Sequence, residues 1–320
     1  MEAHSRSNSA ASLAVWAGLA GLYIIWGTTY FAIALALQTL PPFVAGGVRF
    51  VVAGGLMYAW LRTQRARPFD GVNLPAAALS GVLLSGIGNG FVIWAQQGIP
   101  SGIAALIVTA VPVIVLVLDW AFFSKSAPSV QALIGVALGF AGVATIVTHT
   151  HTLSGSARPI YVAALIAAAI GWSFGTLLQK RSATRNTVLS FTCFQMLAGG
   201  VFQLIMAAIT GEWMRFDAAH ISATSMFALS YLILFGSIFG LNCYLWLLTR
   251  MPTQKVTTYA LVNPVVALFL GAVFLHERIT SMVVLAASLV LTGVALVLFQ
   301  GWNWSAWWQS RRVLRSADTM

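Results

Sequence analysis

The chain has 320 residues and a net charge of +10, and 59% of its residues are hydrophobic while only 8% are charged. Its mean hydropathy of +0.87 lies far above that of soluble domains, which are about half apolar and about a quarter charged. No soluble core could bury so much apolar surface in a chain of this length. The composition therefore excludes a soluble protein and predicts one that crosses the membrane repeatedly.

Ten stretches of the sequence are long and apolar enough to cross a membrane as helices, which takes roughly 20 residues each. They are residues 13–36, 42–61, 75–95, 102–123, 129–148, 159–178, 187–210, 222–249, 256–275 and 281–300. The predicted fold class is an all-α integral membrane protein with ten transmembrane helices. The first stretch is too long for the core of a signal peptide, so we expect it to remain as the first helix.

Basic residues are unevenly shared between the loops on the two sides of the predicted bundle. With the N-terminus in the cytoplasm, thirteen of the 17 Lys and Arg residues face the cytoplasm. Only Arg158, Arg215 and Arg278 face outward, and Arg49 lies within a span. Cytoplasmic loops of membrane proteins carry such an excess, so we expect both termini in the cytoplasm. The net charge follows from this topology and predicts no nucleic-acid partner.

The two cysteines, Cys193 and Cys243, both fall inside predicted spans. They give neither a disulfide framework nor a metal-binding pattern. We expect no metal and no cofactor.

The sequence contains a repeat with an offset of 152 residues. Four residues of the first half recur in the second: Ser85, Gly88, Pro100 and Pro112 correspond to Ser237, Gly240, Pro252 and Pro264. The repeat divides the chain into a polar cytoplasmic tail (1–12), a first five-helix repeat (13–148), an external linker (149–158), a second five-helix repeat (159–300) and a basic, Trp-rich cytoplasmic tail (301–320).

Five spans in each half is an odd number, so the second half must enter the membrane from the opposite side. Such inverted repeats are typical of transporters, whose binding sites lie near the midplane at the repeat interface, beside interrupted helices. Pro112 and Pro264 predict a pair of interruptions at matching positions.

Arg49 is the most unusual residue of the predicted spans, because a buried arginine costs roughly 2.5–3.5 kcal/mol even on lenient insertion scales. It either serves a substrate site or gate, or anchors the helix by reaching the outer headgroups. Asp119, near the inner end of its span, is expected to pair with Lys125. The other candidate substrate-binding residues are polar or amphipathic groups deep in the spans, and for the aromatic ones simple packing is the alternative. With Arg49 and the two prolines, they are Trp26, Tyr30, Asn89, Trp94, Trp172, Asn242, Tyr244, Tyr259 and Asn263.

Several short motifs resemble those of a known family in their order and spacing. They are Trp26-Gly27, Arg49-Phe50, the helices of Pro112 and Pro264, and His276-Glu277-Arg278-Ile279-Thr280. Over residues 13–300 the chain resembles the ten-helix EamA-type branch of the drug/metabolite transporter superfamily, and within it the bacterial aromatic amino acid exporters. The resemblance implies an inner-membrane exporter with a central cavity. One departure is that Ser124-Lys125-Ser126 stands where the second half has His276-Glu277-Arg278.

The expected substrate is a small, neutral, amino-acid-like molecule, and the expected activity is export by alternating access, by a monomer in the lipid bilayer. One cation and one peripheral acid in the spans leave strongly charged substrates without a deep partner. Open alternatives are a multidrug or other metabolite exporter of the same superfamily, or a lipid scramblase or channel. An enzyme is disfavoured, because the spans carry no zinc-protease motif, nucleophile elbow or pair of carboxylates.

The predicted topology can be tested with single cysteines introduced at Ser156 and Ser182. An impermeant thiol reagent applied to intact cells should label the cysteine at 156 and spare the one at 182, because the two loops lie on opposite sides. The parent chain, whose cysteines lie in spans, is the unlabelled control. Labelling of both positions from one side would contradict the inverted arrangement.

Overall fold

The computed structural model describes residues 2–64, 67–124, 128–154 and 159–299, and all regular elements in these ranges are helical. The tail 301–320 and residues 155–158 of the linker lie outside the described residues. The predicted helix ends that differ most from the structure are two: the first helix already begins at Glu2, and the fifth continues to Ser154. In both places polar residues adjoin the apolar run and no proline separates them from it. The helix can therefore continue beyond the membrane-spanning part.

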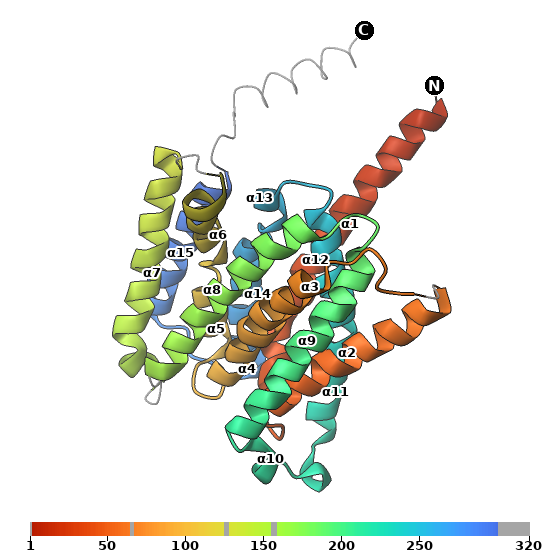
Figure 1. Cartoon of the computed structure of the whole chain (residues 1–320). Coiled ribbons are helices and arrows are strands. Elements are labelled where there is room, and N and C mark those ends of the chain that lie inside the picture. Colours follow the sequence, from red (N-terminus) through yellow and green to blue (C-terminus); the bar gives the residue numbers. More distant parts are fainter. Residues whose placement is uncertain (1, 65–66, 125–127, 155–158, 300–320) are drawn as a thin grey trace.

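The first half consists of five long helical segments, two of which are divided into shorter pieces (Figure 1). They are α1 (Glu2–Ala36), α2 (Pro42–Gln64), α3–η1–α4 (Leu74–Ser80, Gly81–Asn89 and Gly90–Ala95), α5–α6–η2 (Ser101–Val108, Val111–Leu118 and Asp119–Ser124) and α7 (Val130–Ser154).

The second half repeats this order, with two short helices, α10 (Glu212–Arg215) and η3 (Ala218–His220), in one connection. Its segments are α8 (Pro159–Ser182), α9 (Val188–Ile209), α11–η4–α12 (Ala223–Tyr231, Leu232–Phe239 and Gly240–Leu248), α13–α14 (Thr253–Val256 and Tyr259–Phe274) and α15 (Ser281–Leu298). Within the described residues, eight helices are long and apolar enough to cross a membrane, and Val130–Thr145 and Tyr259–Phe274 are shorter apolar helices. These ten confirm the predicted fold class.

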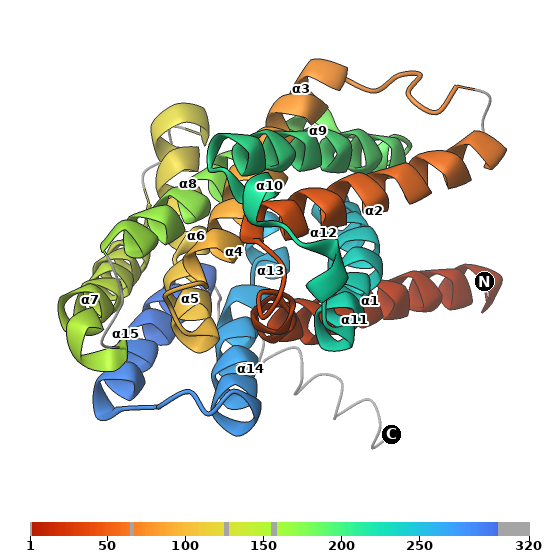
Figure 2. The ribbon, with the colours of Figure 1, turned by 90° about the horizontal axis from the view of Figure 1, so that it is seen from below.

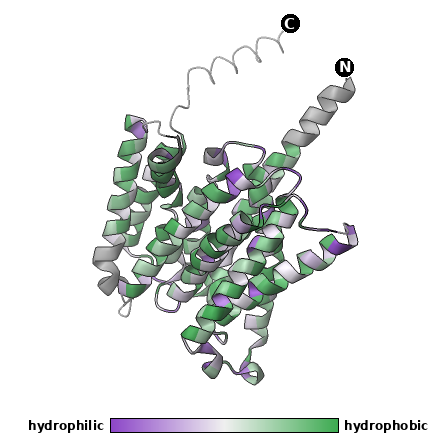
Figure 3. Ribbon diagram, in the orientation of Figure 1, coloured by the Kyte–Doolittle hydropathy of each residue, from purple (hydrophilic) through white to green (hydrophobic). Residues whose placement is uncertain are grey.

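The outside of the bundle is apolar, as expected of a surface that faces lipid. Large side chains such as Ile24, Phe227 and Phe269 are 62–77% exposed. Figure 3 shows hydrophobic residues along the helices and hydrophilic ones gathered toward their ends. The solvent that this surface fits is therefore hydrocarbon, not water.

Glycines allow the helices to approach closely, which is how membrane helices pack without a hydrophobic driving force. A Cβ placed on Gly54 of α2 would lie 2.7 Å from the side chain of Leu197 on α9. In the α7–α15 pair, which stands at one side of the bundle in Figure 1, a Cβ on either Gly135 or Gly293 would lie 2.5 Å from the carbonyl oxygen of the other. Backbone therefore meets backbone at these crossings.

The third segment of each half contains a π-helical stretch, η1 in the first and η4 in the second. Ser85 and Gly88 lie in η1, and their repeat counterparts Ser237 and Gly240 lie in η4 and directly after it. The residues that repeat most clearly in the sequence thus mark matching irregular turns. π-helical turns are rare and often occur at functional sites.

The predicted helix interruptions are right at Pro112 and wrong at Pro264. The fourth segment breaks between Val108 and Val111, directly before Pro112. In the ninth, α14 continues through Pro264 and the break lies earlier, at Thr257 and Thr258. A proline interrupts one backbone hydrogen bond, and a membrane helix packed among neighbours tolerates that loss.

Two adjacent glycines of α2 offer a matched test of the close packing. Gly54→Val should lower the melting temperature of the purified protein, because overpacking a close contact costs about 1–3 kcal/mol. Gly55→Val should have little effect, since nothing lies within 4 Å of a Cβ at Gly55. Equal melting temperatures for the two variants would contradict the packing of α2 against α9.

Candidate substrate-binding site

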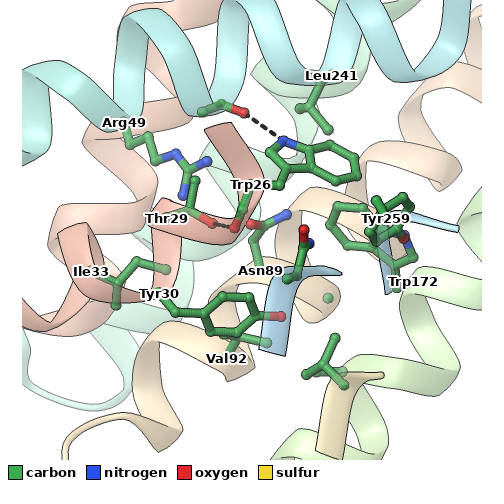
Figure 4. A pocket seen from close by; sticks show the side chains of 15 residues that line it. Trp26, Thr29, Tyr30, Ile33, Arg49, Asn89, Val92, Trp172, Leu241 and Tyr259 are labelled. Carbon is green, nitrogen blue, oxygen red and sulfur yellow. Dashed lines mark hydrogen bonds between the residues drawn. The ribbon is translucent and has the colours of Figure 1, made fainter. Parts of the chain in front are cut away.

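A cavity lies in the middle of the bundle where the two halves meet (Figure 4). Its volume is about 50 Å³. These come from α1, α2, η1, α4, α5, α8, η4, α12 and α14, so nearly every layer of the bundle contributes. They are Trp26, Thr29, Tyr30, Ile33, Arg49, Gly88, Asn89, Val92, Val108, Ala168, Trp172, Gly236, Leu241, Tyr259 and Asn263.

Aromatic rings form one wall of the cavity, with Trp26 at their centre. Its ring centroid lies 5.3 Å from that of Trp172, at an interplanar angle of 82°, and 4.9 Å from that of Tyr259, at 90°. Tyr244 lies 5.1 Å away. Edge-to-face contacts of this kind are favourable for aromatic rings. The Trp26 indole N–H donates a hydrogen bond to the carbonyl oxygen of Gly236, 3.3 Å away, which fixes the ring.

The two tryptophans occupy equivalent places in the two repeats. Trp26 covers Gly240 of the second half and leaves no room for a Cβ there. Trp172 covers Gly88 of the first half, where a Cβ would lie 3.1 Å from its ring. Each tryptophan thus packs on a glycine of the other half, and the two indole rings contact each other between the halves. This exchange is what a two-fold relation between the halves requires, and it places the aromatic wall at the repeat interface.

Among the residues that the structure describes, Arg49 is the one charged side chain that lines the cavity, and it is only 3% exposed. Its Nε donates a hydrogen bond to Ser237 Oγ at 2.7 Å, and its guanidinium carbon lies 4.7 Å from the ring centroid of Phe50. Its Nη1 is buried with no hydrogen-bond partner. Among the described residues no carboxylate forms an ion pair with it. A buried cation in this condition is costly until an anion joins it.

The cavity also carries amide and hydroxyl groups. Asn89 donates to the carbonyl oxygen of Leu84 at 3.2 Å, within the π-helical stretch. Asn263 is 6% exposed, and its Oδ1 has no hydrogen-bond partner. Thr29 donates to the carbonyl oxygen of Trp26 at 2.7 Å. The site thus combines aromatic faces, one cation and an unsatisfied acceptor, and no carboxylate of the described part of the chain lines it.

The structure brings seven of the twelve candidate residues to this cavity: Trp26, Tyr30, Arg49, Asn89, Trp172, Tyr259 and Asn263. Tyr244 lies behind the wall, fully buried, with its hydroxyl 3.0 Å from Thr176 Oγ1. Asn89 and Asn263 come from opposite halves of the chain, as do the two tryptophans, so both repeats supply the site.

The other four candidates lie elsewhere. Trp94 packs on Tyr161, 4.9 Å between ring centroids. Asn242 faces a different hollow and donates to the carbonyl oxygen of Ile238 at 2.6 Å. Pro112 lines a third hollow, and Pro264 is buried within α14.

Sequence reasoning missed the partner of Arg49 and the apolar part of the lining. Ser237 was visible as a repeated residue, but nothing in the sequence linked it to Arg49. The apolar lining residues could not be identified from the sequence, because their helices are apolar on all faces. They include Ile33, Val92 and Ala168. Only the packing decides which of their faces meets the cavity.

Two carboxylates close the end of the bundle that we expect to face outward. Glu277 accepts hydrogen bonds from the backbone N–H groups of Ser101 and Gly102, at 2.6 and 3.1 Å, and so caps α5. Glu212 caps α2 in the same way. Anions are favourable at helix N-termini. Glu277 of the His-Glu-Arg motif therefore ties α14 to a helix of the other half.

The opposite end holds the hollow lined by Pro112, Asp119 and Lys180, among others. Asp119 forms an ion pair with Arg181 at 3.7 Å, and its side chain is 40% exposed. The predicted partner Lys125 lies outside the described residues. α13 and α14 lead from this hollow to the cavity, since Thr253 of α13 lines the hollow and Tyr259 of α14 lines the cavity.

Two segments of the chain, residues 13–148 and 159–299, match the EamA-like transporter family. The uncharacterized inner membrane transporter YedA of Escherichia coli K12 is 36% identical over 288 residues, with 89% of this chain and 90% of that protein covered. Another E. coli K12 relative, named a probable amino-acid metabolite efflux pump, is 28% identical over 292 residues, with 88% and 93% covered.

The fold is shared with a solved crystal structure at a TM-score of 0.62 and 16% identity, with 88% of this chain and 96% of that chain covered. The two family matches together span nearly all of the described chain, one for each half of the bundle. The chain therefore belongs to the EamA-like transporter family.

Proposed function

We propose that this protein exports small neutral amino acids with aromatic or apolar side chains across the inner membrane by alternating access. The observation that carries the proposal is Arg49: it is buried, it has no acid partner among the described residues, and its Nη1 lies unsatisfied beside an aromatic cavity. A substrate carboxylate would supply the missing anion through a charge-assisted hydrogen bond.

The rest of the cavity suits the other parts of an amino acid. The indole and phenol faces of Trp26, Trp172 and Tyr259 would hold an aromatic or aliphatic side chain. Val108 lines the cavity, and Pro112 has no N–H to donate to the carbonyl oxygen of Val108. We propose that this oxygen accepts a hydrogen bond from a substrate ammonium group. Aromatic faces attract the same group.

Other substrate classes fit the lining less well. A nucleotide sugar needs several cations for its phosphates, and Arg49 is the one cation here. A lipophilic drug cation needs a carboxylate or an aromatic box; the cavity offers only rings, and beside Arg49 a second cation is repelled. An amino acid that is neutral overall brings both charges and needs no second charged residue.

The relatives support the general function. Two relatives from E. coli are named as an inner membrane transporter and as a probable amino-acid metabolite efflux pump, which favours transport over catalysis and an inner-membrane location with many spans. We further propose that both termini are cytoplasmic, from the charge distribution, and that the monomer suffices, because one chain forms the whole cavity.

Arg49→Gln should reduce counterflow of labelled phenylalanine and tryptophan into proteoliposomes by roughly tenfold to a hundredfold, as expected for loss of a hydrogen bond to a charged group. Tryptamine, which lacks the carboxylate, should not compete in the parent protein. Arg49→Lys keeps the charge and should retain more flux than Arg49→Gln. Movement of a UDP-sugar or ethidium with none of phenylalanine, tryptophan, methionine or threonine would overturn the proposal.

Two tryptophans provide a matched test of the cavity. Trp172→Ala should reduce amino-acid flux at unchanged membrane expression, because it opens the aromatic wall. Trp94→Ala, which removes an equal side chain outside the cavity, should leave flux near the parent level. A larger loss in the Trp94 variant than in the Trp172 variant would show that the cavity is not the transport site.

Asp119→Asn should leave counterflow unchanged. Proton relays use acids or histidines within the membrane. Asp119 is the one acid of the described spans. It lines the hollow that also contains Pro112 and Lys180, outside the cavity, and it pairs with Arg181. Uphill uptake driven by a pH gradient, present in the parent and lost in this variant, would contradict the expectation.

A further inference from the structure

A long apolar groove, separate from the central cavity, runs along the outside of the bundle between α1, α2, α9 and α12. The groove has a volume of about 1020 Å³, against about 50 Å³ for the cavity. In Figure 2, α1 and α2 diverge on this side of the molecule. The residues that line it are Ala14, Ala17, Gly18, Leu56, Met57, Trp60, Arg185, Asn186, Val188, Leu189, Ile238, Phe239, Asn242, Cys243 and Trp246.

The walls of the groove are apolar and open to the surroundings. Leu56, Trp60 and Phe239 are 43–51% exposed, while small residues, Ala14, Ala17 and Gly18, form the opposite wall on α1. Small residues on one side and large ones on the other leave a furrow that α1 and α2 do not fill. Such a furrow within the membrane takes up hydrocarbon.

The groove and the arginine beyond its end together match the length of one leaflet. Its lining on η4–α12 runs from Ile238 to Trp246, and Arg250 stands just beyond it. From Phe239 to Arg250 is eleven residues, or about 16 Å at 1.5 Å per residue. Half of a hydrocarbon core of about 30 Å is about 15 Å. With the two arginines at the level of the lipid headgroups, the other end of the groove would lie near the midplane.

Two arginines stand at the headgroup end. Arg185 lines the groove, and its Nε donates to the carbonyl oxygen of Thr249 at 3.3 Å. Arg250 lies over the ring of Trp246, 4.4 Å from its centroid, and donates to Thr249 Oγ1 at 3.5 Å. Both guanidinium groups thus gather around Thr249, where α12 has just ended. Partial burial and the charge of Arg185 both lower the pKa of Arg250, so the two cations are close enough to repel each other.

Nothing in the described part of the chain neutralises this pair. Ion pairs there join Asp119 to Arg181 and Asp217 to His220, and neither includes Arg185 or Arg250. The C-terminal end of α12 attracts cations, and Arg185 donates one hydrogen bond to a carbonyl oxygen there. Most N–H donors of the two guanidinium groups remain available. Planar guanidinium donors match phosphate oxygens well.

We propose that this groove is a binding site for an anionic phospholipid, with one acyl chain along α1, α2 and α12 and the headgroup phosphate between Arg185 and Arg250. An apolar channel of one leaflet's length that ends in two uncompensated cations at the headgroup level has the shape and charge of one lipid molecule. Basic residues at a membrane surface attract anionic lipids. The site does not depend on the identity of the exported substrate.

The test is binding of phosphatidylglycerol to the purified full-length protein, followed by native mass spectrometry and by the melting temperature in detergent. Phosphatidylglycerol should bind and raise the melting temperature more than phosphatidylcholine with the same acyl chains. Removing the arginines should weaken binding roughly fivefold for each. The variants are Arg185→Gln/Arg250→Gln, and as a control of equal charge Arg215→Gln/Arg278→Gln at the other end of the bundle.

A second variant, Ala17→Trp, fills the groove without changing charge and should weaken lipid binding while both arginines stay. Inorganic phosphate at the same concentration should not reproduce the melting shift. The proposal is overturned if phosphatidylcholine binds equally well, if the control double variant loses as much binding as the groove variant, or if inorganic phosphate gives the same shift. Melting of each variant without lipid separates loss of binding from loss of folding.

Discussion

The close approach of helices at glycines is the constraint on which this structure depends. Lipid offers the helices no hydrophobic reason to associate, so contact area must come from backbones that nearly touch. Gly47 and Gly200 place α2 directly against α9, and Gly175 places α8 against η1. These contacts hold α2 deep in the bundle, and Arg49 is carried with it into the interior. The position of the Arg49 side chain is therefore set by close packing of uncharged backbone, and not by a charged partner.

Close packing also explains why the cavity forms where it does. The π-helical stretches widen two helices at matching places, and each widened turn meets a tryptophan of the other half. The large rings cannot enter a helix crossing made for glycines, so they stand together at the repeat interface. The aromatic wall and the space in front of it therefore have the same cause: the bulky rings do not fit between helices that cross as closely as these.

Much of this arrangement could be predicted from the sequence, and the failures have a common cause. Ten apolar runs, the cost of a buried Arg49 and the repeated Ser85 and Ser237 are local or periodic signals. Trp94 and Asn242 looked equally suited to the site, but their helices are apolar on all faces, so no polar stripe reveals which way a side chain points. The caps made by Glu277 and Glu212 join residues about 170 positions apart, and no sequence spacing indicates them.

Both halves contribute aromatic rings to the site, but its one positive charge among the described residues comes from the first half, and this difference gives the site a direction. In the second repeat, the hydroxyl of Ser237 accepts a hydrogen bond from Arg49. In the first, the carbonyl oxygen of Ser85 accepts one from the neutral amide of Gln203 at 2.7 Å. The aromatic wall is shared by both halves, whereas the charge belongs to one. A symmetric cavity would accept a substrate in two equivalent orientations, but a carboxylate finds its cation only on the side of α2 and η4. A zwitterion would therefore be held in one orientation, with its side chain on the shared aromatic wall.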